Sequence, residues 1–502
     1  MSTVDLLQEI HHLKFACPDA IERDLLNAWR TYRVSDITRQ LQSESGREIY
    51  AEAIVFEPND EPKSFFPKSL AELVVEHLAT SFDGGPIPEG LTCEQQRDFG
   101  ALLDVELPIL KLLDVDNTTF WRRVTKTKTK TLVEFLKFDR DNSTHWKNLG
   151  VALKVAETIE HETPEYWFEG DLEDILEKSQ PFVEKLAISQ LQPFNQIEPE
   201  ENYEEYKIYN PTPDLCSHGS LVVLKHLVNL TSISLAFGLG DATKGYERRF
   251  FIFSLEDVKN LVKAMVHFQH LRHFKLSRSR MEPDKLKTLL DQLSTMNIET
   301  LEFPYCYLGT DTGMLLAKYI SKCSEMLKNL NLSGNFLDGQ QIENFGYGIN
   351  VYQGMLEKLD LSHNPIGEAG VLTLGGAIKN MQQIRELNVT GCEIGEQGAF
   401  RVVQLLGFHH PLRILHMNCT PLGRAGGKKL IEVLKENWLV EEVNCKFCDL
   451  KPSHEKRIQS ILRRNKKFHL ARQNSNNAST SSGGDLPTSS SSSNEKSCSM
   501  PQ

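Results

Sequence analysis

Apolar residues in the second half of the chain recur in one pattern that is copied along the sequence. The clearest copy begins at Leu327 and continues with Leu330, Leu332, Asn335 and Leu337. Seven copies follow one another at intervals of 27–29 residues and begin at Leu271, Ile298, Leu327, Leu356, Ile384, Leu412 and Val440. Such a period predicts a stack of repeated structural units, each packed against its neighbours.

Each unit is expected to contain one short strand and one helix. Apolar residues two positions apart, such as Leu330 and Leu332, suit a strand that turns alternate side chains into the core. A glycine turn and then apolar residues at helical spacing follow. In one copy these are Leu286, Leu289, Leu290 and Leu293. Before another such helix, Ser254 and Asp257 have the spacing of a capping box.

One polar column accompanies the apolar ones. At the same place in successive copies stand Cys306, Asn335, Asn364 and Cys392. A side chain there can satisfy backbone groups as the chain leaves the strand, which is a feature of the leucine-rich repeat pattern. The sequence therefore predicts an α/β solenoid, a ribonuclease-inhibitor-like leucine-rich repeat horseshoe with about eight repeats over residues 220–452. The first two strands are 41 residues apart, and we expect an inserted loop over residues 238–249.

The regions on either side of the repeats lack this period. Amphipathic stretches such as Leu70, Leu73 and Val74 favour helices before the repeats. We expect an N-terminal helical extension over residues 1–66, a helical domain over residues 67–197 and an acidic linker over residues 198–219. After the repeats we expect a basic capping helix over residues 453–472 and a disordered, serine-rich tail over residues 473–502.

Composition narrows the class of protein. The 502 residues carry a formal net charge of −12, which argues against general binding to nucleic acid. The N-terminus lacks the features of a signal peptide, and no apolar run is long enough for a membrane-spanning helix. Ten scattered cysteines suit a reducing compartment. We expect a soluble protein of the cytoplasm, with neither nucleic-acid nor membrane partners.

The motifs of the common enzymes are missing from the sequence. Cys445 and Cys448 form a C-x-x-C pair, but the repeat places both in structural positions, and no second pair lies at zinc-finger spacing. The run from Gly426 to Lys429 lacks the first glycine and the hydroxyl of a phosphate loop. We therefore expect no catalytic residue, no cofactor and no bound metal.

Outward-facing positions of the strands are candidates for protein binding. One column lies between the two core residues of each strand and reads Ser234, Lys275, Glu302, Asn331, Asp360, Asn388, His416 and Asn444. A second column precedes the Asn/Cys position and includes Phe237, Arg278, Tyr305, His363 and Phe447. Mixed polar and aromatic side chains suit protein recognition, although an ordinary solvated sheet face fits equally well. Arg463, Arg464, Lys466 and Lys467 form a basic segment that either binds an acidic partner or is simply solvated.

Parts of the sequence resemble a known family. Residues 253–264 and 271–281, with blocks around Trp121 and Trp146, are similar to the t-complex-associated testis-expressed protein family, the leucine-rich-repeat (fifth) subunit of the nexin–dynein regulatory complex. The resemblance covers residues 68–470. It implies a non-enzymatic scaffold in the axoneme of motile cilia and flagella. Its implied partners are other, coiled-coil subunits of that complex, with doublet tubulin or dynein components as further candidates.

Two other functions remain open on the sequence alone. Ran-type GTPase-activating proteins also carry ribonuclease-inhibitor-like repeats, but they would require a polar group such as Arg278 or Arg280 to reach a nucleotide. A cytosolic leucine-rich-repeat adaptor or inhibitor would use the concave face. A shared fold does not separate these functions.

Overall fold

The computed structural model describes most of the chain from Lys68 onward. The described residues are 68–128, 143–161, 171–191, 193, 218–237, 253–323, 326–352, 355–379, 381, 383–407 and 411–480. The expected N-terminal extension, the inserted loop and nearly all of the acidic linker lie outside them. The chain divides into two compact units, residues 1–78 with 130–139 and residues 79–129 with 140–502. Apart from residues 68–78, the described residues all belong to the second unit.

Helices precede the repeats, as the sequence predicts. They are α4 (Leu70–Thr80), α5 (Cys93–Leu102), α6 (Ile109–Leu112), α7 (Thr118–Lys128), α8 (Ser143–His161) and α9 (Asp171–Ser179). Trp121 of α7 is completely buried against Gly150 of α8, and its indole nitrogen donates to the carbonyl of Val115 at 2.8 Å. The tryptophan blocks that carried the family resemblance thus build the core of this helical region.

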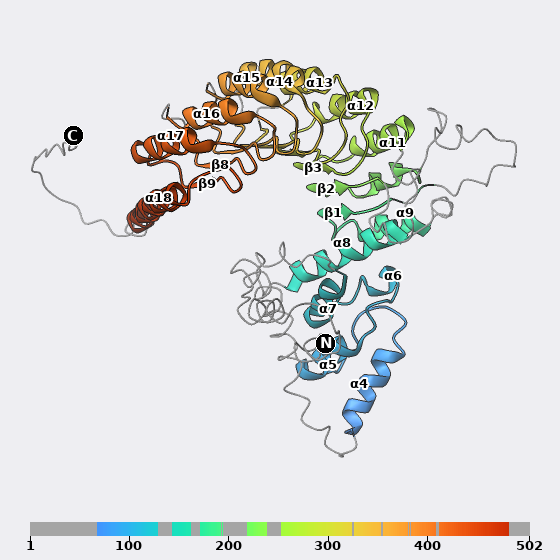
Figure 1. Ribbon diagram of the computed structural model, residues 1–502. Coiled ribbons are helices and arrows are strands. Elements are labelled where there is room, and N and C mark those ends of the chain that lie inside the picture. The colour runs from blue at the N-terminus through green and yellow to red at the C-terminus, as the bar shows by residue number, and fades with distance from the viewer. Residues whose placement is uncertain are drawn as a thin grey trace, which may run out of the picture. The chain divides into compact units, whose positions relative to one another are not determined.

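One parallel sheet runs through the rest of the described chain. Its strands lie side by side in sequence order (Figure 1). They are β1 (Lys185–Ile188), β2 (Ser232–Leu235), β3 (His273–Leu276), β4 (Thr300–Glu302), β5 (Asn329–Asn331), β6 (Lys358–Asp360), β7 (Glu386–Asn388), β8 (Ile414–His416) and β9 (Glu442–Asn444). The predicted solenoid of strand–helix repeats is confirmed.

The sheet has nine strands in the described residues, one more than we expected. The additional strand, β1, lies in the segment that we assigned to the helical domain, and it pairs in parallel with β2. Its inward residues Leu186 and Ile188 are buried. The other expected domain boundaries stay predictions.

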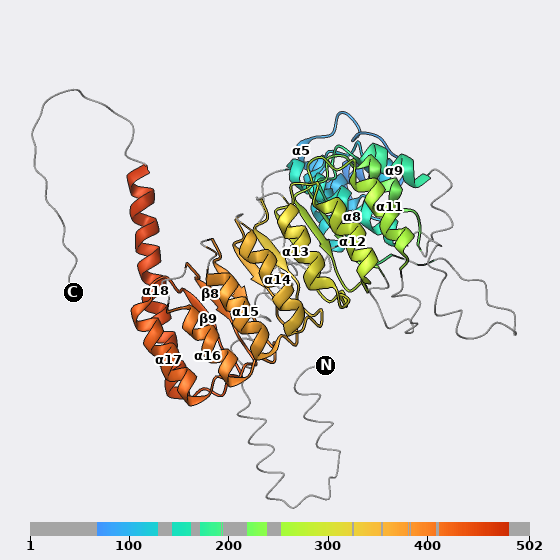
Figure 2. The same ribbon diagram turned by 90° about the horizontal axis from the view of Figure 1, so that it is seen from above.

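Helices cover the outer side of the curved sheet (Figure 1), and they stack side by side along it (Figure 2). These outer helices are α11 (Leu255–Met265), α12 (Pro283–Leu293), α13 (Thr312–Lys322), α14 (Gly339–Val351), α15 (Gly367–Lys379), α16 (Gly395–Leu405) and α17 (Gly423–Glu436). A short 3₁₀ helix, η3 (Leu221–His226), precedes α11 in the chain. The capping box of Ser254 and Asp257 is present at α11. The helical leucines 286, 289, 290 and 293 are all buried, as predicted.

Two kinds of position form the core of each repeat. The inward leucines of the strands, such as Leu330 and Leu359, are at most 2% exposed. The asparagine column satisfies the backbone where the chain leaves the sheet, because Nδ2 of Asn335 donates to the carbonyls of Leu332 (2.8 Å) and Phe303. The cysteines of that column donate weakly instead, as Cys392 Sγ does to the carbonyl of Leu361 at 3.1 Å.

The last helix is longer than we expected. α18 runs from Pro452 to Thr480, so that residues 473–480, which we assigned to the disordered tail, are helical. Residues 481–502 lie outside the described part of the chain. None of the helices in the described ranges combines the length and the apolar character needed to cross a bilayer.

Candidate functional site

The concave face of the sheet carries the first column of candidate residues in the predicted alignment. The strand register places Lys275 beside Glu302, Asp360 beside Asn388, and His416 beside Asn444. Nζ of Lys275 lies 3.2 Å from a carboxylate oxygen of Glu302. These outward side chains therefore contact one another between strands, as parallel in-register strands allow.

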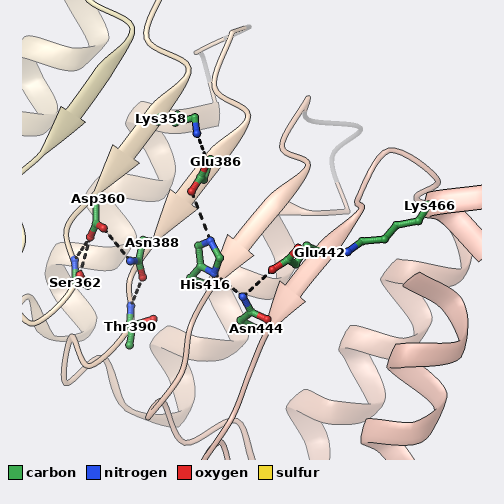
Figure 3. A network of polar contacts seen from close by, with 10 residues as sticks. All are labelled: Lys358, Asp360, Ser362, Glu386, Asn388, Thr390, His416, Glu442, Asn444 and Lys466. Carbon is green, nitrogen blue, oxygen red and sulfur yellow. Dashed lines mark hydrogen bonds and ion pairs between the residues drawn. The ribbon is translucent and has the colours of Figure 1, made fainter. Parts of the chain in front are cut away.

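A longer network joins the last four strands (Figure 3). Asn388 donates to Asp360 at 2.9 Å, and Asp360 also accepts from the hydroxyl of Ser362 at 2.6 Å. On the next column, Glu386 lies between Lys358 (2.8 Å) and Nε2 of His416 (3.5 Å). The face is thus a preorganised polar surface.

The network continues to the helix that closes the solenoid (Figure 3). Asn444 Nδ2 lies 2.7 Å from Nδ1 of His416 and donates to Glu442 at 2.9 Å. Glu442 also pairs with Lys466 of α18 at 3.3 Å. Partial burial would raise the pKa of Glu442, but the hydrogen bonds from Asn444 and Lys466 outweigh it and lower the pKa. The carboxylate therefore stays ionised, and it links β9 to α18.

The second candidate column lies along the rim where the strands end. Its members share a backbone conformation with φ between +51° and +67°, which favours glycine. They are Arg278, Tyr305, Gly334, His363, Gly391, Cys419 and Phe447. Phe237 does not belong to this column. It is 1% exposed and stacks on Phe253 at 4.2 Å, so our placement of this residue on the outward face was wrong.

Aromatic side chains gather on two neighbouring repeats of this rim. Tyr305 and Tyr307 follow β4, and Phe336 follows β5; all three are about half exposed or more. The rings of Tyr307 and Phe336 are 5.2 Å apart, and the ring of Tyr305 lies against Gly334. A bulky residue at positive φ costs about 1–3 kcal/mol, and these three keep it while staying exposed. We call Tyr305, Tyr307 and Phe336 the aromatic rim.

The four basic candidates at the C-terminal end do not form one surface. Arg464 donates to the carbonyl of Leu434 at the end of α17, and Lys466 pairs with Glu442. Arg463 and Lys467 are exposed. Arg464 and Lys466 therefore contact the last repeat, while Arg463, Lys466 and Lys467 are exposed.

Of the C-x-x-C pair, Cys448 lies in the structural position that the repeat predicts. Cys448 is buried and donates to the carbonyl of Met417 at 3.0 Å, while Cys445 is half-buried and its pKa is raised by burial to about 12. Among the residues that the structure describes, no three His, Cys, Asp or Glu side chains gather as a metal site.

A family model described as "Leucine Rich repeat" matches residues 355–375, which contain β6 and the start of α15. This match and the strand–helix period decide the class. The chain contains leucine-rich repeats.

Curated proteins that it resembles include dynein regulatory complex subunits and a ribonuclease inhibitor. It is 23% identical over 232 residues to dynein regulatory complex subunit 5 of Macaca fascicularis, covering 45% of each chain. The protein of the same name from Chlamydomonas reinhardtii is 25% identical, over 43% of this chain and 49% of that one. Mouse ribonuclease inhibitor is 32% identical over 22% of this chain and 24% of its own. The resemblance to the regulatory-complex subunit is confirmed, and the chain spans about half the length of those relatives.

The sequence did not single out four exposed aromatic residues of the described chain as candidates. Tyr307 and Phe336 occupy the position just after the Asn/Cys column, where another copy has Pro365. An aromatic residue at that exposed position is the signal that could have found them. Trp438 and Phe468, at the C-terminal end, were missed because they lie outside the repeat consensus. The part that each candidate residue plays in binding stays a prediction.

Proposed function

We propose that this chain is a non-enzymatic scaffold subunit of a dynein regulatory complex in the axoneme of cilia or flagella, where it contributes to the regulation of motility. Its similarity to dynein regulatory complex subunit 5 supports the complex and the location. The aromatic rim beside an ordered polar sheet is the observation that carries the scaffold role. In this proposal the protein is held in the cytoskeleton through contacts with other subunits.

The physical basis is a rigid surface with few, well-placed anchors. Polar side chains of the concave face are already paired with one another, so binding immobilises few of them. Tyrosine and phenylalanine are common anchors of protein interfaces, and Tyr305, Tyr307 and Phe336 supply them at one edge. Long coiled-coil subunits are the partners we propose for this surface. Doublet tubulin and dynein components are further candidates.

The proposal is tested by purification of the tagged full-length chain from ciliated cells. We expect wild type to co-purify with regulatory-complex subunits. A variant with Tyr305→Ala, Tyr307→Ala and Phe336→Ala should recover much less of them. The control carries Met314→Ala, Tyr347→Ala and Leu372→Ala, which remove exposed apolar side chains from α13, α14 and α15.

The control should behave as wild type. Equal recovery by all three proteins would remove the aromatic rim from the account, and failure of wild type to recover any subunit would reject the proposed complex.

A further inference from the structure

The last helix closes the solenoid with one face and leaves the other exposed. Ile458, Ile461 and Leu462 of α18 are buried, and α18 packs on α17. Asn465 is also buried, and its side chain donates to the carbonyls of Asn437 (3.0 Å) and Val440 (2.8 Å). The buried face of α18 thus covers the end of the stack, as a capping element must.

Arg464 fixes a tryptophan beside this helix. Its guanidinium donates to the carbonyls of Leu434 (3.1 Å) and Lys435 (3.4 Å), which end α17, and lies 3.6 Å from the centre of the Trp438 ring. A cation at a helix C-terminus and over an aromatic face is favourable on both counts. The indole is therefore held rigidly, although it is 43% exposed.

One further apolar side chain, Phe468 of α18, is exposed beside this tryptophan. Phe468 packs edge-on against Trp438, with ring centres 5.7 Å apart, and is 46% exposed. Rigid, half-exposed aromatic rings next to an arginine have the composition of interface hot spots.

The exposed face of α18 is strongly cationic. Arg463, Lys467 and Lys456 are spaced so that they lie on the side of the helix opposite the buried isoleucines. Among the described residues, none of the three forms an ion pair with a carboxylate. Glu455 is the one acidic residue over positions 452–471. A chain with net charge −12 thus concentrates unpaired positive charge on the helix that also carries Phe468.

We propose that this C-terminal cap, formed by Trp438, Arg463, Lys467 and Phe468, is a docking site for an acidic segment of a partner protein that carries one large apolar side chain. The cations attract the acidic residues, and the aromatic pair receives the apolar one. Charge complementarity of this kind brings the partner in, and the aromatic contact retains it.

Two other anionic partners, a membrane surface and a nucleic acid, fit this cap less well. An interfacial membrane helix needs a continuous apolar face, and the apolar face of α18 is already buried against the repeats. General binding to nucleic acid conflicts with the net negative charge of the chain. This docking site is separate from the aromatic rim, so the inference goes beyond the proposed function and is tested on purified protein.

The experiment measures binding of the purified full-length chain to a labelled synthetic peptide in which glutamates flank one phenylalanine. Wild type should bind saturably, and binding should weaken as salt is raised. Arg463→Glu with Lys467→Glu should weaken binding about tenfold or more. Phe468→Ala should weaken it as well, and so should replacement of the peptide's phenylalanine by alanine.

A control variant carries Arg424→Glu with Lys428→Glu, which make the same change of charge on the exposed face of α17. It should bind as wild type does. Absence of saturable binding by wild type, or equal loss in the control, would overturn the proposal. So would binding of anionic lipid vesicles or single-stranded RNA in place of the peptide. If the protein bound the peptide but did not join axonemes, the docking site would stand and the proposed function would fail.

Discussion

The side-chain amide of Asn364 holds the backbone of Asn335, one repeat earlier in the chain. Oδ1 of Asn364 accepts from the backbone nitrogens of Asn335 (2.9 Å) and Leu337 (3.0 Å). Its Nδ2 donates to the carbonyls of Leu332 and Leu361. Asn335 makes the corresponding contact with Cys306 at 2.7 Å. Neighbouring repeats are therefore tied together by buried hydrogen bonds as well as by apolar packing.

Replacement of Asn364 by alanine should be strongly destabilising. The change leaves the buried backbone nitrogens of Asn335 and Leu337 without an acceptor, and each such group costs about 1–3 kcal/mol. We expect a total loss of about 2–4 kcal/mol, measured as the shift of the urea unfolding midpoint. Asn388→Ala, on the half-exposed concave face, is the matched control and should cost less than about 1 kcal/mol. Similar losses in the two variants would contradict the role of the buried column.

Two glycines with the same backbone angle give a test of the aromatic rim. Gly334 and Gly367 both have φ of +67°, but a Cβ on Gly334 would overlap the ring of Tyr305, whereas one on Gly367 meets no atom within 4 Å. Gly367→Ala should cost about 1–2 kcal/mol from its backbone alone. Gly334→Ala should cost clearly more.

The excess at Gly334 should disappear when Tyr305→Ala is added, since the overlapping ring is then absent. The measurement is thermal unfolding of Gly334→Ala, Gly367→Ala, Tyr305→Ala and the double variant Gly334→Ala with Tyr305→Ala, each compared with wild type. If Gly334→Ala and Gly367→Ala were equally destabilising, Tyr305 would not lie against Gly334 in solution.

Cysteine reactivity reports on the buried column without any mutation. Burial raises the pKa of the Cys306 thiol and of the Cys392 thiol to about 12, from an ordinary value of 9.0. At pH 8 only about one in ten thousand of these thiols is ionised, and the thiolate is the form that reacts.

Brief alkylation of the native protein at pH 8 should therefore modify the exposed Cys93 and Cys419 and spare Cys306 and Cys392. Mass spectrometry identifies the modified sites, and the denatured protein, in which all four should react, is the control. Modification of Cys392 as fast as Cys419 would place the column in solvent.

The Ran-type alternative also makes a distinct prediction. Arg280 is paired with Glu282 at 3.5 Å, and the polar groups of the concave face are paired with one another. We therefore expect the purified protein not to accelerate GTP hydrolysis by a Ran-type GTPase. A hundredfold stimulation that is lost on Arg278→Ala or Arg280→Ala would replace the scaffold account by a catalytic one.

Much of the repeat architecture follows from the sequence because its period is set by local rules. Alternation in the strands and the Asn/Cys column fix which residues are buried, so the concave column was aligned correctly. β1 was missed because Leu186 lies 47 residues before its counterpart Ile233, so the period is broken there. The buried residues Val183, Leu186 and Ile188 nevertheless repeat the apolar spacing of the later copies.

The candidate surfaces were harder to predict, because exposed residues obey no packing rule. Arg464 looked like its neighbour Arg463 in the sequence, and only the position of α17 shows that it caps carbonyls beside Trp438. The sequence placed Phe237 in an outward column because the insertion after it interrupts the repeat period. In the structure its ring packs against Phe253 in the core.

The central claim is that this chain is a structural part of the axoneme. The most direct measurement is the fraction of the tagged full-length protein that stays with axonemes, isolated from ciliated cells and washed with salt. The account predicts that most of it remains bound after membranes and soluble proteins have been removed, together with other regulatory-complex subunits. Recovery of the protein in the soluble fraction, while those subunits stay on the axoneme, would contradict it.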